Sequence, residues 1–301
     1  MYRWIRWAVI AACVSGVFPV AVIAAGPVDV LPVRVGDGAV ELHGDWSFTY
    51  VPSSDVGQYE AFYQPAFDAS GWDSIPVPSH WELQGFARPK YKKVDEGTGL
   101  YRRKFRPPSA WRGQRVFLRF DGVLYGLTAW INGTPVGEWA SAYNPVTFDV
   151  TEAVRPDAEN LLAVRVTTRS RGYEFDTNDC WALSGIYRDV TLFALPTLHL
   201  TDYTARTTLR LDGTADVEVA VAASGAGRVE GRLVAPDGAA AGVFTAALDA
   251  SGRGLGRVSV VRPRLWTAET PSRYRLELAL ESGGRVVQRF ADSIGLRQVT
   301  I

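Results

Sequence analysis

Residues 127–139 read LTAWINGTPVGEW, which is two short apolar runs joined by Asn132–Gly133. Both central residues of such a two-residue turn must accept a positive φ, and asparagine and glycine do so at low cost. Asn-Gly between two apolar runs is therefore a strong hairpin signal, and we predict an antiparallel strand on each side of the turn.

Similar runs continue along the chain on both sides of this hairpin. Gly, Pro, Asn and Asp bound them, and hardly any segment beyond residue 27 has the period of a long amphipathic helix. The turns between runs are short, whereas a parallel connection needs about a dozen residues or more, which favours antiparallel pairing. We predict an all-β protein made of sandwiches or barrels. The clearest runs cover residues 116–120, 161–166, 189–193, 217–222, 231–234, 256–261 and 274–280.

A change of composition near Leu195–Pro196–Thr197 indicates a domain boundary. Trp and Tyr are frequent before it, whereas Ala, Gly, Val and Arg dominate after it. We predict a jelly-roll-like β-sandwich over residues 28–196 and an immunoglobulin-like β-sandwich over residues 197–301.

The overall composition indicates a well-packed protein with a neutral partner. The chain of 301 residues is 47% hydrophobic and 12% aromatic, and its formal net charge is zero. Disordered chains combine low hydrophobicity with high net charge, which is not the case here. A balanced charge supplies no long-range attraction to nucleic acid or to an anionic membrane, so we expect neither as a partner.

The N-terminus has the pattern of an export signal. Arg3 and Arg6 precede an uncharged stretch over residues 7–23, and a small-residue exit follows at residues 24–27. We predict a signal peptide over residues 1–25 and a periplasmic or extracellular protein without a membrane segment after cleavage. An uncleaved anchor and a lipoprotein attached at Cys13 are the weaker alternatives. Removal of the peptide would leave Cys180 as the only cysteine, which allows no intramolecular disulfide.

Two common kinds of catalytic site find little support. The chain has three histidines (His43, His80 and His199) and no G-x-S-x-G motif, which argues against a nucleophilic triad. It also lacks the paired cysteines and closely spaced histidines typical of zinc sites. We therefore expect the three histidines to be structural or surface residues.

The best candidate for chemistry is the sequence YEFDTNDCW at residues 173–181. Its acidic and amide groups could simply cap a loop through local hydrogen bonds. They could also contact a sugar, because Asn178 and Asp179 accept hydrogen bonds from hydroxyl groups and Trp181 offers a flat apolar face to a sugar ring. Glycoside hydrolysis needs two carboxyl groups at a defined separation, and this cluster does not identify such a pair.

Several motifs, in order, resemble the N-terminal domains of glycoside hydrolase family 2. WALSGIYRDV at residues 181–190 resembles the signature that closes the sugar-binding domain, and VPSHWELQGF at residues 77–86 with PKY at 89–91 resembles the β-galactosidase branch. PRLWTAETP at residues 263–271 resembles the family's immunoglobulin-like domain, and IGLRQVTI at 294–301 resembles the segment that leads into its catalytic barrel. Further matches are LYRRKF at 100–105, FDGV at 120–123 and WING at 130–133.

The resemblance implies hydrolysis of terminal β-linked sugars with retention, by two glutamates on a (β/α)₈ barrel that follows the immunoglobulin-like domain. Such a barrel needs roughly 250 residues, so we expect this chain to contain neither glutamate and to be inactive alone. The barrel is then its expected partner, beside a neutral β-glycoside or oligosaccharide. We expect no cofactor in this chain, and a metal ion bound by the barrel would lie outside it.

The resemblance also assigns two contact positions. Asp179 matches an aspartate that contacts galactose in the family's β-galactosidases. Lys93 stands where the family has a second contact, an asparagine two residues after the tyrosine of the Pro-x-Tyr motif. A cation in place of a neutral amide puts galactose in doubt and leaves room for another β-glycoside or for an acidic sugar.

Two alternatives to a hydrolase portion remain. The chain could be a stand-alone exported carbohydrate-binding protein that uses the same loop without chemistry, or a structural module in which Asp179 and Trp181 only order that loop. The apolar end Val299–Thr300–Ile301 falls within a family motif, which favours a truncated chain that associates with itself when it lacks the missing part.

Overall fold

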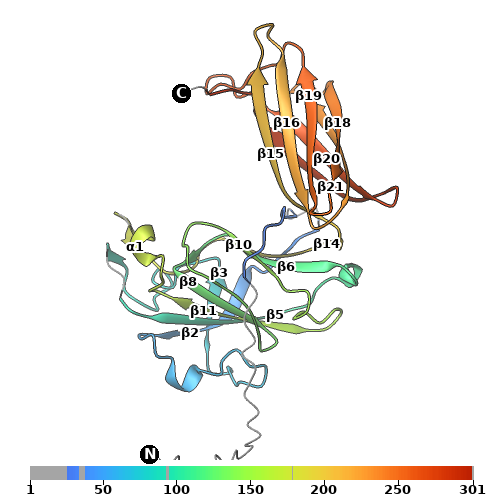
Figure 1. Ribbon diagram of the computed structural model, residues 1–301. Helices are drawn as coiled ribbons and strands as arrows, with labels where there is room; N and C mark the ends of the chain where they lie inside the picture. The colour runs from blue at the N-terminus through green and yellow to red at the C-terminus, as the bar shows by residue number, and fades with distance from the viewer. Residues whose placement is uncertain (1–25, 34–37, 93–94, 178, 300–301) are drawn as a thin grey trace, which may run out of the picture.

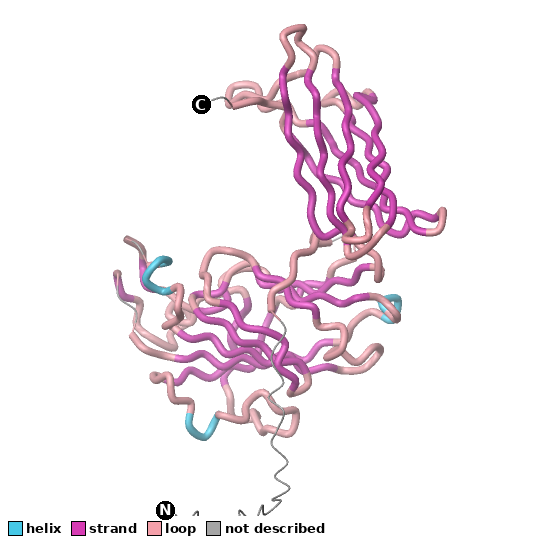
Figure 2. Tube along the Cα trace, in the orientation of Figure 1, coloured by secondary structure: helices cyan, strands magenta, loops and turns pink. Residues whose placement is uncertain are grey.

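The computed structural model describes residues 26–33, 38–92, 95–177 and 179–299, and Figure 1 shows their arrangement. Strands dominate these residues, as Figure 2 shows, and α1 (Tyr173–Asp176) is a single α-helical turn. The prediction of an all-β protein is therefore confirmed. The predicted signal peptide over residues 1–25 lies outside the described residues. None of the helices in the described ranges is long and apolar enough to cross a membrane.

The first β-sandwich has a six-stranded sheet in the order β3-β2-β5-β11-β8-β9 and a four-stranded sheet in the order β1-β14-β6-β10. The strand pairs in both sheets are antiparallel, as predicted from the short turns. This is the jelly-roll-like sandwich expected from the sequence. Its strands are β1 (Val40–Glu41), β2 (Gly44–Val51), β3 (Asp73–Val77), β5 (Thr98–Phe105), β6 (Arg115–Phe120), β8 (Gly126–Ile131), β9 (Thr134–Trp139), β10 (Val146–Asp149), β11 (Asn160–Thr167) and β14 (Val190–Leu195).

The core of this sandwich lies between the two sheets. Alternate residues of β11 point into it, so that Leu162, Val164 and Val166 are fully buried. Large aromatic side chains fill the remaining space, among them Phe48, whose ring centroid lies 4.6 Å from that of Tyr101. Aromatic rings at such distances add specific contacts to the area they bury, which fixes the sheets relative to each other.

The predicted hairpin is present as β8 and β9. Asn132 has a φ of 53° and Gly133 a φ of 88°, as a two-residue turn of this kind requires. The Asn132 amide also donates from Nδ2 to Ala153 O at 2.9 Å and to Asn160 Oδ1 at 2.8 Å. The turn therefore closes the hairpin and is also bound to the loop after β10 and to the start of β11.

The second β-sandwich packs a three-stranded sheet, in the order β15-β16-β19, against a four-stranded sheet in the order β18-β17-β20-β21. Alternation of buried and exposed residues is regular, as in β16, where Val217, Val219 and Val221 are buried. The immunoglobulin-like sandwich expected from the sequence is thus present. Its strands are β15 (Leu200–Leu209), β16 (Ala215–Ala223), β17 (Gly227–Val234), β18 (Ala240–Leu248), β19 (Arg253–Val260), β20 (Tyr274–Ser282) and β21 (Arg285–Ile294).

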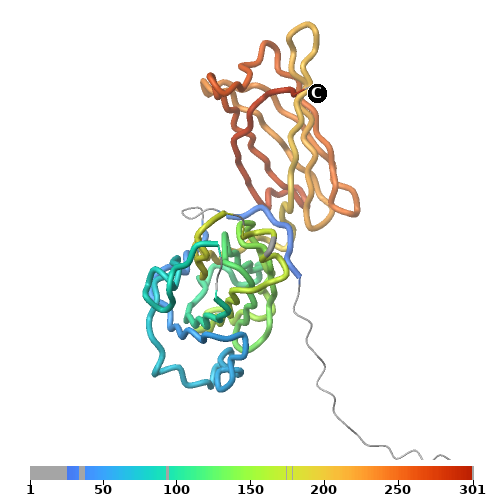
Figure 3. Tube along the Cα trace, turned by 90° about the vertical axis from the view of Figure 1, so that its left-hand side faces the viewer, coloured from blue at the N-terminus to red at the C-terminus, as the bar shows by residue number. Residues whose placement is uncertain are grey.

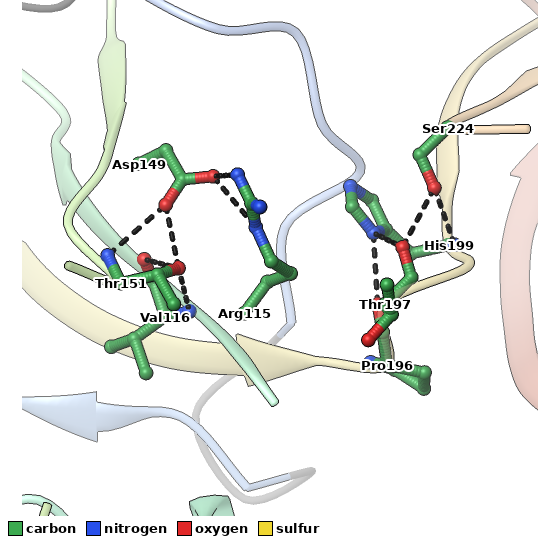
Figure 4. Close-up of polar contacts among 8 residues, drawn as sticks. All are labelled: Arg115, Val116, Asp149, Thr151, Pro196, Thr197, His199 and Ser224. Atoms are coloured by element: carbon green, nitrogen blue, oxygen red, sulfur yellow. Dashed lines mark hydrogen bonds and ion pairs between the residues drawn. The ribbon is translucent and has the colours of Figure 1, made fainter. Parts of the chain in front are cut away.

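The connection between the sandwiches is short and hydrogen-bonded. β14 ends at Leu195 and β15 begins at Leu200. Figure 4 shows His199 turned back on this connection: its Nδ1 lies 2.9 Å from Pro196 O, and its backbone N–H donates to Ser224 Oγ at 3.0 Å. The same figure shows Asp149 hydrogen-bonded to Arg115 and Thr151, where β10 ends and β6 begins.

An N-terminal segment supports the same connection. Figure 3 shows the described residues before β1, in blue, running along the junction of the two sandwiches. Val28 N–H donates to Thr147 O of the first sandwich at 2.9 Å, and Leu31 N–H donates to Leu200 O of the second at 3.4 Å. This segment therefore contacts both sandwiches.

Candidate functional site

A group of loops at one end of the first sandwich forms the candidate site. There β4 (Lys90–Tyr91) pairs with β12 (Trp181–Ala182), and Tyr91 and Trp181 are Cα partners. The turn α1 lies just before β12 and is fastened by Asp176, whose Oδ2 accepts the Ala142 N–H at 2.9 Å. Two segments that are far apart in the sequence thus lie side by side.

The segment that follows Trp181 is also held by Trp81 and Glu82. The buried Glu82 carboxylate accepts the Ser184 N–H at 2.8 Å, and the Trp81 N–H donates to Ser184 O at 3.2 Å. Burial raises the pKa of Glu82, because a charge is costly away from water. The backbone after Trp181 is therefore fixed by contacts to residues about a hundred positions away in the sequence.

Asp179 stands in the loop between α1 and β12 with an exposed side chain, 70% accessible to solvent. Its φ of 49° lies in the left-handed region, which aspartate tolerates better than most residues. The Tyr91 hydroxyl donates to Asp179 Oδ1 at 2.5 Å, and Lys92 Nζ lies 3.3 Å from the same oxygen. Lys92 also has a positive φ, 64°, and its N–H donates to Cys180 O at 3.1 Å.

These contacts favour the ionised form of Asp179. The hydrogen bond from Tyr91, and after it the contact with Lys92, lowers the pKa of Asp179. The same hydrogen bond raises the pKa of Tyr91, since it stabilises the protonated phenol. At neutral pH the pair is thus a carboxylate that accepts and a phenol that donates.

Exposed aromatic side chains lie in the same group of loops as the carboxylate. Trp181 is 60% exposed, and its ring centroid lies 6.0 Å from that of Tyr91 with the planes 67° apart. Phe175 in α1 is 89% exposed. An ionised acceptor beside exposed aromatic rings has the chemistry to bind a sugar, through its hydroxyls and through the apolar face of its ring.

The residues behind this surface are tyrosines and one histidine. Tyr143 Oη lies 3.9 Å from Cys180 Sγ, and burial raises the pKa of Tyr143 to about 12. His80 stacks on Tyr187 with centroids 5.4 Å apart, and burial lowers the pKa of His80. His80 is consequently neutral at neutral pH, and its Nδ1 lies 3.3 Å from Ser184 O. These contacts fit the structural role expected for it.

The structure brings together two of the four residues that the sequence predicted as contacts, Asp179 and Trp181. The other two, Asn178 and Lys93, lie outside the described residues. Sequence reasoning missed Tyr91 and Lys92 as partners of Asp179. Tyr91 belongs to the Pro-x-Tyr motif, but it is 88 positions from Asp179, and only the pairing of β4 with β12 brings the two together.

Among the residues that the structure describes, one group of possible metal ligands lies elsewhere, at the end of β1, just after it and just before β14. Donor atoms of Glu41, His43 and Asp189 lie within 4.8 Å of one another. His43 Nδ1 is 3.6 Å from Glu41 and Nε2 is 3.2 Å from Asp189, so that the imidazole stands between the two acids. Contacts between the side chains themselves account for this arrangement.

Comparison with known proteins matches nearly the whole described chain. Residues 40–196 match the sequence model "Glycosyl hydrolases family 2, sugar binding domain", and residues 198–297 match "Glycosyl hydrolases family 2". The chain is 31% identical over 292 residues to a β-galactosidase of Priestia megaterium, and the match covers 86% of this chain and 28% of the relative. A β-galactosidase of Pectobacterium atrosepticum is 33% identical over 291 residues, with the same coverage. The chain thus spans about 28% of the length of these relatives.

Solved structures show the same two-sandwich arrangement. A β-glucuronidase of Bacteroides uniformis superposes with a TM-score of 0.73 at 26% identity, over 86% of this chain and 32% of that one. The fold also matches a β-glucuronidase of Bifidobacterium dentium in complex with coumarin-3-O-glucuronide, at a TM-score of 0.75 and 20% identity, over 91% of this chain and 50% of that one. Because the family models match both of its sandwiches, the chain belongs to glycosyl hydrolase family 2.

Proposed function

We propose that this chain is the non-catalytic N-terminal portion of a secreted, β-galactosidase-like glycoside hydrolase, and that its Asp179 loop contributes a contact to the sugar site. The catalytic glutamates would lie on a barrel domain outside the 301 residues. The observation that carries the proposal is the ionised carboxylate of Asp179, held by Tyr91 beside the exposed Trp181. It lies in a domain that belongs to a family of sugar-binding domains.

The proposed substrate is a terminal β-galactoside. The relatives at 31% and 33% identity are β-galactosidases, which supports this class. A β-glucuronide is the second candidate, since the Lys92 ammonium near Asp179 would attract a carboxylate on the sugar and the similar solved structures are β-glucuronidases. The two sugars differ in charge, so a direct comparison of their binding separates them.

The test begins with the 301-residue chain and NMR titration of two probes, methyl β-D-galactopyranoside and methyl β-D-glucuronide. We expect the galactoside to bind weakly, Asp179→Ala to abolish the binding, and a control such as Tyr63→Phe, far from the loop in the sequence, to leave it unchanged. When the chain is joined to its catalytic domain, Asp179→Ala should lower kcat/KM. If Asp179→Ala instead destabilised the fold and left binding and kcat/KM intact, the residue would only order the loop.

A stand-alone carbohydrate-binding protein is the alternative that the exposed Trp181 and Phe175 would also suit. In that case the chain would bind the sugar just as tightly without any further domain, and the coding sequence after Ile301 would contain no barrel. We expect the chain alone to show no hydrolysis of p-nitrophenyl β-D-galactopyranoside. Measurable hydrolysis by the 301 residues would contradict the proposal.

Secretion is part of the proposal and rests on the N-terminal pattern. Arg3, Arg6 and the uncharged residues 7–23 support export, followed by cleavage after Ala24 or Ala25. N-terminal sequencing of the protein recovered from a periplasmic extract checks this. A mature protein that still begins at Met1 would contradict it.

A further inference from the structure

Tyr91 makes three separate contacts in the candidate site. Its backbone is the partner of Trp181 in the β4–β12 ladder, and its ring meets that of Trp181 at 6.0 Å. Its hydroxyl donates to Asp179 Oδ1 at 2.5 Å. One side chain therefore links the aromatic surface with the carboxylate.

Asp179 needs such a link because little else orders it. Its side chain is 70% exposed. Its backbone is in the left-handed region, which does not form the regular backbone hydrogen bonds of a strand. Both polar contacts of this carboxylate go to Oδ1, and Oδ2 carries none within the described part of the chain. The carboxylate is thus anchored through one oxygen and open at the other.

We propose that Tyr91 is a positioning residue for Asp179: its hydroxyl fixes Oδ1 and so leaves Oδ2 directed to accept hydrogen bonds from sugar hydroxyls. This inference rests on the proposed function, because it takes Asp179 as a sugar contact. No sequence pattern assigns this role to Tyr91.

Tyr91 is better suited to this role than Lys92. An exposed ion pair contributes little, because a long flexible side chain must lose rotational freedom to hold one geometry. The tyrosine has two side-chain torsions, and its ring is placed by Trp181 and by the ammonium of Lys92, which lies 5.3 Å from the ring centroid. The hydroxyl of Tyr91 therefore sets the direction of the carboxylate, and Lys92 adds charge.

The arrangement has a titration signature. The hydrogen bond from Tyr91, and after it the contact with Lys92, lowers the pKa of Asp179. Within the described residues, the titratable groups near the Tyr91 side chain are Asp179, Lys92 and Cys180. Removing the Tyr91 hydroxyl should raise the pKa of Asp179 towards its ordinary value. Sugar binding uses the ionised carboxylate. On acidification, the loss of sugar binding should therefore begin at a higher pH in this variant than in wild type.

The experiment uses the 301-residue chain labelled with ¹³C at the aspartate carboxyl groups, and methyl β-D-galactopyranoside as the probe. In Tyr91→Phe we expect a raised Asp179 pKa and binding weakened by about twofold to tenfold, the range for loss of one hydrogen bond. Tyr63→Phe, which removes a phenol hydroxyl on another loop, should change neither. The reciprocal variant Asp179→Asn should lower the pKa of Tyr91, which the absorbance of the phenolate reports.

The outcomes separate this inference from the proposed function. An unchanged Asp179 pKa in Tyr91→Phe would overturn the inference, and should that variant not fold, an unchanged Tyr91 pKa in Asp179→Asn would overturn it as well. If Asp179→Asn lost binding while Tyr91→Phe kept it, only the positioning role would fail. If Asp179→Asn kept full binding, the proposed sugar contact itself would fail.

Discussion

The two sandwiches are built from different side chains. The twelve largest fully buried residues all belong to the first sandwich, and most are aromatic, including Trp46, Trp81 and Phe48. The core of the second consists mainly of Val, Leu and Ala. Its strands are eight to ten residues long and are joined mainly by tight turns, whereas those of the first are two to eight residues long with longer irregular loops between them.

This difference shows where function can be placed. Four of the five non-glycine residues with positive φ in the described chain lie in the first sandwich: Lys92, Asn132, Asp157 and Asp179. Such conformations persist only when surrounding contacts hold them. Asn132 is held by its hydrogen bonds to Ala153 and Asn160, and Asp179 by its contacts with Tyr91 and Lys92. The second sandwich, with Arg262 as its one example, has a regular backbone suited to a spacer.

The largest expected effect tests whether the two cores are independent. Phe48→Ala removes a fully buried ring and should destabilise the first sandwich by about 3–5 kcal/mol. Urea unfolding can be followed by tryptophan fluorescence, which reports mainly on the first sandwich, and by far-UV circular dichroism. The urea midpoint of the first sandwich should fall, and that of the second sandwich should stay unchanged. If both moved together, the two sandwiches would unfold as one cooperative unit.

The next effect concerns the hairpin turn. Asn132→Ala removes hydrogen bonds to Ala153 and Asn160 and places alanine at a positive φ, so we expect a loss of about 2–3 kcal/mol in unfolding free energy. Asn132→Gly keeps the backbone conformation and should cost less. Equal losses in the two variants would mean that only the side chain matters.

A smaller effect should depend on pH. The folded state raises the pKa of Glu82, so the unfolded chain releases this proton at a lower pH than the folded chain. The contribution of Glu82 to stability is therefore highest in acid and falls as the pH rises from the unfolded pKa to the folded pKa. Glu82→Gln should remove this fall, because an amide does not titrate, while its oxygen still accepts the Ser184 N–H. Unfolding free energies measured between pH 4 and pH 8 check it, and parallel profiles for wild type and variant would argue against it.

The smallest effect on stability should come from the candidate site. Asp179→Ala changes an exposed side chain, and we expect the unfolding free energy to stay close to that of wild type. A thermal melt beside the sugar titration measures both properties in one sample. A loss as large as that of Asn132→Ala would place Asp179 with the structural residues of the first sandwich.

Local signals carried most of the fold prediction. Asn132–Gly133 specifies its own turn, and alternation such as that of β16 specifies which face of a strand is buried. The contact role of Asp179 came from the family resemblance of the motif around Trp181, and it stays a prediction. The partner Tyr91 could not be predicted, because its contact depends on the register of two strands that the sequence separates by 90 residues, from Tyr91 to Trp181.

The hydrogen-bonded joint at His199 gives the second sandwich the properties of a lever arm. β15 has ten residues, which at about 3.3 Å per residue is roughly 33 Å of strand beyond the joint. A rotation of about 10° at the joint would displace the far end of that strand by roughly 6 Å, more than the length of a hydrogen bond. His199 is bonded to Pro196 O and Ser224 Oγ, and its ring centroid lies 5.3 Å from that of Phe117 in β6, so its contacts help to set the angular tolerance between the two sandwiches.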